Sequence, residues 1–194
     1  MVKYLYLILM LMSAMSCSEG FTTAEREVIN AGQGDVMYVL SIAHQSDSVV
    51  LRSQSKPLTC QMVSSEEFAT LRRRMLATVQ SPEHQGVGIA APQVGILRRV
   101  VAVQRFDKAD EPFEFFINPE IVEFSDEVAA GGEGCLSVPD IHDDVIRSQR
   151  ITLRYYDENF EQHEQIIEGF TAVIFQHEID HLDGKLFIDY LEEK

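Results

Sequence analysis

Apolar side chains recur at helical spacing in the first half of the chain. Ser64 and Glu67 have the spacing of a capping box, which marks the start of a helix. Behind them, an apolar residue returns every three or four positions, at Phe68, Leu71, Met75 and Val79. This period predicts an amphipathic helix over residues 66–80, which Ser81-Pro82 would end.

A second helical pattern lies near the C-terminus, over residues 170–182, and Gly184 supplies its stop signal. One face carries three apolar side chains and then two histidines: Phe170, Val173, Ile174, His177 and His181. We therefore expect a helix that presents two imidazoles on the same face as an apolar stripe.

Between and around these helices, runs rich in β-branched and aromatic residues predict strands. They cover residues 99–105, 114–117, 120–124, 151–156 and 162–168. A turn signal at Asn118-Pro119 separates the second run from the third, and Asp157-Glu158-Asn159 makes the last two a hairpin. Residues 36–42 are apolar enough for a short strand or a helical turn, and the sequence leaves that choice open. Because no β-α-β rhythm appears, we predict an α+β fold with antiparallel sheets packed around the C-terminal helix.

The first residues form a separate unit. Lys3 precedes an apolar run from Tyr4 to Met12, which is too short to span a bilayer and is typical of a secretory signal. The small residues before Cys17 resemble the end of a bacterial lipoprotein signal, in which the cysteine becomes lipidated.

This pattern predicts a signal peptide over residues 1–17 that ends at a lipidated Cys17, a flexible tether over 18–34 and a folded domain over 35–194. The protein would then be exported and tethered to a membrane through its lipid anchor alone. A cytoplasmic protein, with the apolar run as a buried strand, is the alternative.

Composition and charge narrow the class of protein. The chain has 194 residues, of which 45% are apolar and 24% charged, as expected for one globular domain. Its net charge of −15 argues against a nucleic-acid surface, which needs clustered lysine and arginine. We therefore expect no nucleic-acid partner.

The strongest chemical signal is the run His177-Glu178-Ile179-Asp180-His181. Residues four apart on a helix lie above one another, so both imidazoles can reach one ion. Glu178 lies beside that ion rather than on it, where a base that activates water belongs. The C-terminal helix is thus predicted to bind a metal.

A catalytic site of this kind needs a third protein ligand. Metalloproteases with this motif take it downstream, but position 187 is Phe here, which counts against a metalloprotease. The donor must come from upstream. Cys135, in Glu133-Gly134-Cys135-Leu136-Ser137, is the candidate, because thiolate is a normal ligand for zinc and iron.

With these residues assembled, the sequence resembles the peptide deformylases from about residue 35 to residue 190. Three family motifs are present in order. They are Gly86-Val87-Gly88-Ile89-Ala90-Ala91-Pro92-Gln93, Glu133-Gly134-Cys135-Leu136-Ser137 and His177-Glu178-Ile179-Asp180-His181.

The resemblance implies a role for each matching position. Cys135, His177 and His181 would hold one divalent metal ion, Fe(II) or Zn(II), and Glu178 would be the acid and base. The side-chain amide of Gln93 and the backbone N–H of Leu136 would donate hydrogen bonds to the developing oxyanion.

The resemblance also implies how a substrate would bind. The backbone at Val87 and Gly88 would align the peptide as an added strand. A methionine side chain would enter an apolar pocket that has Glu133 at its rim and is lined by Val87, Phe170, Val173 and Ile174.

Two further positions carry expectations about the surroundings of the site. Asp180 would pair with Arg147 and support the metal ligands from behind. His142 falls where some deformylases have an arginine that contacts the substrate.

The implied activity is removal of the N-formyl group from the N-terminal methionine of peptides or nascent proteins, with release of formate. The alternative is an exported, non-catalytic domain that binds formylated peptides or metal. Some bacterial members continue into a basic C-terminal helix that touches the ribosome, whereas this sequence ends in Leu-Glu-Glu-Lys. We therefore expect no ribosome docking by that route.

Overall fold

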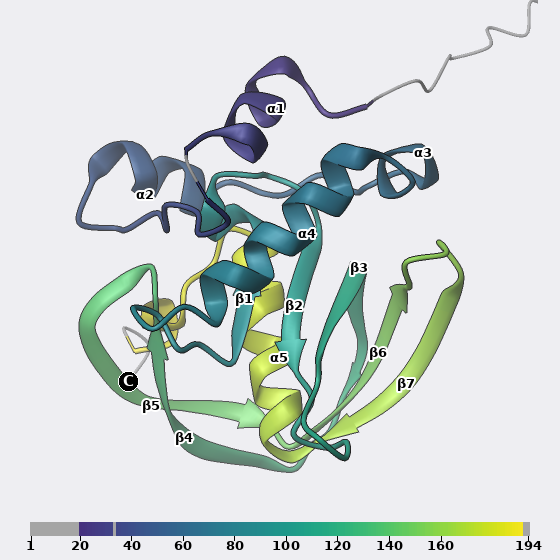
Figure 1. Cartoon of the computed structure of the whole chain (residues 1–194). Helices are drawn as coiled ribbons and strands as arrows, with labels where there is room; N and C mark the ends of the chain where they lie inside the picture. The colour runs from purple at the N-terminus through teal and green to yellow at the C-terminus, as the bar shows by residue number, and fades with distance from the viewer. Residues whose placement is uncertain (1–19, 33, 192–194) are drawn as a thin grey trace, which may run out of the picture.

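The computed structural model describes residues 20–32 and 34–191 (Figure 1). The helices are α1 (Thr23–Asn30), α2 (Gln45–Leu51), α3 (Cys60–Val63), α4 (Glu66–Val79) and α5 (Gly169–Leu182), with 3₁₀ turns η1 (Ala91–Val94) and η2 (Phe187–Tyr190). The strands are β1 (Gly88–Ala90), β2 (Val100–Gln104), β3 (Phe113–Phe124), β4 (Val128–Cys135), β5 (Val138–Ser148), β6 (Arg150–Tyr156) and β7 (Gln162–Glu168).

The strands form two antiparallel sheets. One has five strands in the order β1-β2-β3-β6-β7, and the other is the β4-β5 hairpin. Helix α5 runs between them, with the large sheet on one side and the hairpin on the other (Figure 1). The predicted α+β architecture around the C-terminal helix is confirmed.

Strand β2 is buried on both faces and therefore sets the order of the layers. Its residues alternate in direction, so Val100 and Ala102 join the core cluster under α4, whereas Val101 and Val103 join the cluster under α5. The sheet thus has a helix on each face, and α5 is fixed against it by an apolar core.

The predicted helix over residues 66–80 is α4, and its four periodic apolar side chains are at most 1% exposed. The predicted capping box is wrong by one residue. Ser65 is the N-cap, and its Oγ accepts a hydrogen bond from the N–H of Phe68 at 3.2 Å. Ser64 instead ends the short helix α3, which the sequence pattern did not reveal.

The predicted break at Asn118-Pro119 is absent, and β3 runs through it as one strand. Asn118 takes a left-handed backbone conformation, with φ of 49°, at a register shift against β6. Its side-chain amide accepts from the N–H and donates to the carbonyl of Leu58, at 2.8 and 2.9 Å. The turn-forming residues Asn118 and Pro119 therefore form a bulge within the strand.

The β4-β5 hairpin was missed by the sequence pattern. Most residues of β4 are small and exposed, and much of β5 is charged and exposed, so neither strand shows regular apolar alternation. The predicted β6-β7 hairpin is confirmed.

Residues 36–42 form neither of the two elements that their composition allows; they run as irregular chain. The N–H of Leu40 donates to the carbonyl of Gln93, and the N–H of Ile42 donates to that of Ser137, at 2.8 and 3.0 Å. This segment therefore braces η1 and the β4-β5 turn, which carry two of the three family motifs.

The tether predicted over residues 18–34 is wrong for its described part, because it contains helix α1. Phe21 and Ile29 are buried in the core with α4. Glu25 forms a largely buried ion pair with Arg98 at 2.6 Å, and Arg74 donates to the carbonyl of Ile29 at 2.5 Å. The folded domain therefore begins near residue 21 rather than at residue 35.

Among the residues that the structure describes, no helix combines the length and the apolar character needed to cross a membrane. The apolar run from Tyr4 to Met12 and Cys17 lie outside the described residues.

A packed α1 makes a prediction that a flexible tether does not. Ile29→Ala should lower the free energy of unfolding by about 2–5 kcal/mol, because it leaves a cavity in the core under α4. Urea unfolding measures this change. Glu27→Ala, at an exposed position of the same helix, is the control and should change it little. Equal stability of the two variants would instead indicate that this segment is a flexible tether.

Candidate metal centre and active site

Helix α5 and the end of strand β4 bring three metal-ligating side chains together. The ligand atoms of Cys135, His177 and His181 all lie within 4.8 Å of one another. The Sγ of Cys135 is 3.2 Å from Nε2 of His181, and the two imidazole centroids are 5.1 Å apart. The i,i+4 spacing on α5 thus places His177 and His181 side by side, as expected, and the hairpin supplies the third donor.

A buried ionic network fixes the ring of His177. Its Nδ1 is 2.8 Å from Oε2 of Glu133, whose two oxygens also accept from Nε and Nη2 of Arg147 at 2.7 and 3.2 Å. The Nη1 of Arg147 reaches Oδ2 of Asp180 at 2.6 Å, so the predicted Asp180–Arg147 pair is present. With Nδ1 occupied, the Nε2 lone pair is the one left for an ion.

This arrangement adds contacts that the expectation for Glu133 did not include. It was expected at the rim of a substrate pocket. It does line the cavity, but it is only 7% exposed and both of its oxygens are held by Arg147 and His177. Burial works against its charge, yet hydrogen bonds from His177 and Arg147 outweigh it and lower the pKa of Glu133. It therefore acts as an anionic partner that holds the ring of His177 in place.

The two imidazoles differ in their surroundings. Burial lowers the pKa of His181 well below its usual value, which keeps this ring neutral with a free lone pair. For His177 burial acts in the same direction, but hydrogen bonds to Cys135 and Glu133 outweigh it and raise the pKa. The two rings therefore differ in how readily they take up a proton.

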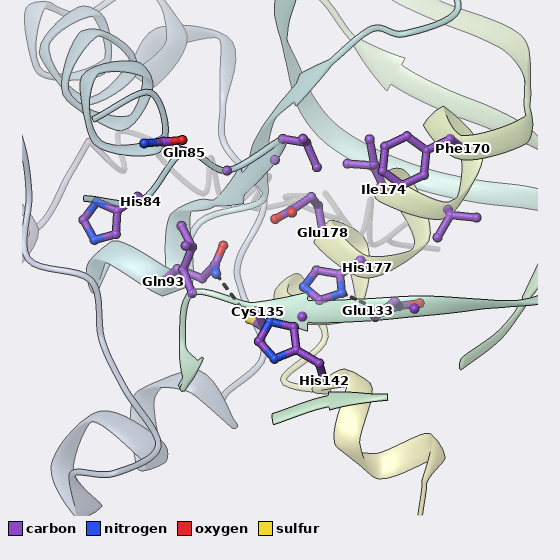
Figure 2. Close-up of a pocket in the computed structure, with 17 residues that line it drawn as sticks. His84, Gln85, Gln93, Glu133, Cys135, His142, Phe170, Ile174, His177 and Glu178 are labelled. Carbon is purple, nitrogen blue, oxygen red and sulfur yellow. Dashed lines mark hydrogen bonds and ion pairs between the residues drawn. The ribbon is translucent and has the colours of Figure 1, made fainter. Parts of the chain in front are cut away.

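Glu178 lies one residue beyond His177 and points into the cavity (Figure 2). It is 4% exposed, and its Oε2 has no hydrogen-bond partner among the described residues. Burial raises the pKa of Glu178 to about 7, a value suited to a group that accepts and returns a proton near neutral pH.

Strand β1 makes room for this carboxylate. A Cβ on Gly88 would lie 2.9 Å from both Cγ and Cδ of Glu178 and closer still to Oε1. Glycine is therefore required at this position so that the carboxylate can reach the cavity. The first family motif and the third meet at this contact.

Gln93, on η1, is fixed in one orientation. Its Oε1 accepts from the N–H of Ala90 at 2.8 Å, which turns the Nε2 group towards Cys135 Sγ, 3.6 Å away (Figure 2). Leu136 lies in the turn after β4 and lines the same cavity. A side-chain donor and a backbone position therefore flank the sulfur of Cys135.

A cavity of about 390 Å³ opens beside Cys135 and His177. All residues predicted to bind substrate line it: Val87, Gly88, Glu133, Phe170, Val173 and Ile174. Ile174 is buried, whereas Phe170 is 55% exposed and its ring lies 5.2 Å from that of Phe106. The apolar part of the cavity is thus formed mainly by α5 and by Val87, directly before β1.

Three further polar side chains line the cavity: those of His84, Gln85 and His142. The sequence pattern gave no role to His84 and Gln85; their position directly before Gly86 was the available signal. His142 pairs with Gly134 across the hairpin, where a Cβ would lie 2.5 Å from its Cδ2. The glycine of the second motif therefore allows the imidazole of His142 to lie across β4.

The donor set fits a divalent transition metal. One thiol sulfur and two imidazole nitrogens, none of them exposed, are preferred by zinc and iron rather than by calcium or magnesium. Nδ1 of one ring is held by a carboxylate, as is usual for metal-bound histidine. The adjacent cavity leaves an approach for water and substrate.

Fold and site together define a class of protein: an α+β metallohydrolase in which a helix with the His-Glu-x-x-His pattern meets a cysteine from a β-hairpin. The polypeptide deformylase family profile matches residues 39–194, and the chain belongs to this family. The protein is therefore a metal-dependent hydrolase.

Curated relatives and solved structures agree. The peptide deformylase of Leptospira biflexa is 37% identical over 74% of this chain and 83% of its own length. Peptide deformylase 2 of Xanthomonas axonopodis is 43% identical over 73% of this chain and 81% of its own length. The Met-Ala-Ser-bound class I type b peptide deformylase of Acinetobacter baumannii superposes with a TM-score of 0.70 at 37% identity, covering 80% of this chain and 98% of that one.

The ligand assignment predicts the metal content of variants. Cys135→Ser and His177→Ala should each lose the bound divalent ion, because two remaining donors compete poorly with water and buffer. Elemental analysis after gel filtration measures the occupancy. Cys60→Ser, at an exposed cysteine of α3, is the matched control and should keep the ion. Full occupancy in the Cys135 or His177 variant would refute the assignment.

Proposed function

We propose that the protein hydrolyses the formamide at the N-terminal methionine of formylated peptides or nascent proteins and releases formate. The observation that carries this proposal is the unpartnered, buried carboxylate of Glu178 beside a Cys-His-His donor set in a member of the deformylase family. The related Acinetobacter structure with bound Met-Ala-Ser supports a peptide that begins with methionine.

Glu178 is the acid and base of this reaction. Its carboxylate takes a proton from the attacking water and then returns it to the leaving amine, so that formate and a free N-terminus result. The bound ion supplies Lewis-acid assistance when it is present in the Cys135–His177–His181 site. The low exposure of Glu178 keeps bulk water from competing for the proton.

Gln93 and Leu136 stabilise the developing oxyanion. The Nε2 group of Gln93 is oriented before the reaction by the hydrogen bond from Ala90, so no reorganisation is needed as charge develops. The backbone N–H of Leu136 is the second donor. One such donor contributes roughly 3–4 kcal/mol to transition-state stabilisation.

The methionine side chain enters the apolar part of the cavity between Val87 on one side and Val173 and Ile174 on the other. Phe170 is exposed without substrate and would be covered by it. The backbone at Val87 and Gly88 pairs with the peptide. This assignment gives the first motif two functions, because Gly88 also leaves room for Glu178.

The cofactor is one divalent ion, Fe(II) or Zn(II), held by Cys135, His177 and His181. The choice between them is linked to location. Oxygen chemistry can oxidise a cysteine thiolate, whereas zinc has no redox chemistry of its own and accepts the same donors.

The protein is exported and tethered through a lipid on Cys17, with Tyr4–Met12 as the apolar core of the signal. Because α1 is packed on the domain from residue 21, only a short link would separate the lipid from the fold. An exported deformylase carries zinc or belongs to a host that lives with little oxygen.

The non-catalytic alternative is not favoured. A domain that only bound formylated peptides would have no need of a buried carboxylate with a free oxygen next to the metal ligands. Burying that group costs stability, and the cost is explained by a role in proton transfer.

The role of Glu178 is tested by Glu178→Gln. The amide cannot accept a proton, so kcat on a formyl-methionyl peptide should fall by about 100-fold or more while the metal content stays unchanged. Gln93→Leu should also lose activity, but less completely, because Leu136 still donates. Near-normal kcat in Glu178→Gln with full metal occupancy would exclude it as the base.

The contact between β1 and α5 gives a second prediction. Gly88→Ala should displace the Glu178 carboxylate and strongly reduce kcat, without loss of metal or fold, since no ligand is touched. Gly131→Ala is the matched control, because a Cβ there meets nothing within 4 Å. If both variants retain wild-type kcat, the steric account of Gly88 is wrong.

Location is tested by cell fractionation. Wild-type protein should be found with the membrane and Cys17→Ala should not, with equal activity per molecule because Cys17 has no part in the site. Mass spectrometry of the native protein should find Cys17 as the modified N-terminus. An unprocessed Met1 in a soluble fraction would refute export, and iron in an exported protein from an oxygen-grown host would refute the choice of zinc.

A further inference from the structure

We infer that Tyr190 is a positioning residue for the metal ligand His177. It acts through three largely buried side chains that lie between them: Asp180, Arg147 and Glu133. The inference rests on the proposed metal site and adds to it a residue outside all three family motifs. Tyr190 belongs to η2, the short 3₁₀ turn that follows α5.

Tyr190 contacts two of these three side chains, Asp180 and Arg147, at once. Its Oη donates a hydrogen bond to Oδ1 of Asp180 at 3.0 Å, and its ring lies under the guanidinium of Arg147, with Cζ 4.5 Å from the ring centroid. A cation over an aromatic face is attracted to it, so the ring holds the guanidinium plane while the hydroxyl holds its partner.

Arg147 transmits this position because its guanidinium is rigid and planar. Nη1 is bound to Asp180, and Nε and Nη2 form a fork on the carboxylate of Glu133. A shift of Asp180 or a tilt of the plane would therefore move Glu133 as well. The side chains of Arg147 and Glu133 are each 5% exposed, so water is poorly placed to replace a lost contact.

Glu133 is the last of the three side chains, and it contacts Nδ1 of His177. This bond fixes the ring so that the opposite nitrogen faces the ion. His181 differs, because its Nδ1 has no hydrogen-bond partner among the described residues. The network that begins at Tyr190 thus orients one of the two histidines through its Nδ1 and makes no such bond to the other.

Tyr190 is separated from the substrate side. Together with Arg147 and Asp180 it lines a different cavity of about 380 Å³, and it is absent from the residues that line the substrate cavity. Removing its hydroxyl should therefore alter metal binding and kcat, but not the KM for substrate.

The test is the affinity for Co²⁺, measured by competition with a chromophoric chelator, for the wild type and Tyr190→Phe. The phenyl ring keeps the contact with Arg147 and loses only the hydroxyl, and we expect affinity to fall about tenfold, the lower end for outer-shell partners. In Tyr190→Leu, which loses the ring too, the affinity for Co²⁺ should fall further. In zinc-loaded enzyme, kcat should fall and KM should stay constant.

Tyr38→Phe is the matched control. Its hydroxyl also bonds a carboxylate, Oδ2 of Asp47 at 3.0 Å, but at an exposed site away from the metal ligands. Wild-type Co²⁺ affinity in Tyr190→Phe, or an equal loss in Tyr38→Phe, would overturn the inference while the proposed function stands. Failure of the wild type to bind Co²⁺ would overturn both.

Discussion

The structure depends on the burial of two imidazoles and three carboxylates around one helix. Glu133, Glu178, Asp180, His177 and His181 are all buried or largely so, and charges in such surroundings are stable only with partners. Arg147 supplies the cation for two of the carboxylates, and the proposed metal ion supplies the charge that balances the thiolate. The Oε2 of Glu178 has no hydrogen-bond partner among the described residues, and burial raises the pKa of this carboxyl to about 7.

Apolar packing fixes the elements that carry these polar side chains relative to one another. Val101 and Val103 of β2 fix α5 from the sheet side, and alternate residues of the same strand fix α4 on the other face. Residues 36–42 then connect η1 to the β4-β5 turn through the carbonyls of Gln93 and Ser137. Each of the three motifs is thus carried by a different element, and the core clusters on the two faces of β2 keep their functional atoms within a few ångströms.

The sequence revealed those features that depend on local pattern. Helices α4 and α5, the β6-β7 hairpin and the three motifs follow from periodicity, turn residues and fixed spacing. It missed what depends on distant contacts. The amide of Asn118 replaces backbone pairing through Leu58, and α1 is stabilised by Arg98 and Arg74, far along the chain. Likewise, no local signal shows that Glu133 faces His177 or that Tyr190 reaches Asp180.

This buried arrangement should hydrolyse a formamide and not a peptide bond. To test this, zinc-loaded protein is incubated with formyl-Met-Ala-Ser, and formate, free Met-Ala-Ser and any shorter peptide are quantified by enzymatic assay and mass spectrometry. We expect formate and Met-Ala-Ser in equal amounts and no shorter peptide. Formyl-methionine with Ala-Ser, or intact substrate after incubation with protein that retains its metal, would rule out formamide hydrolysis at this site.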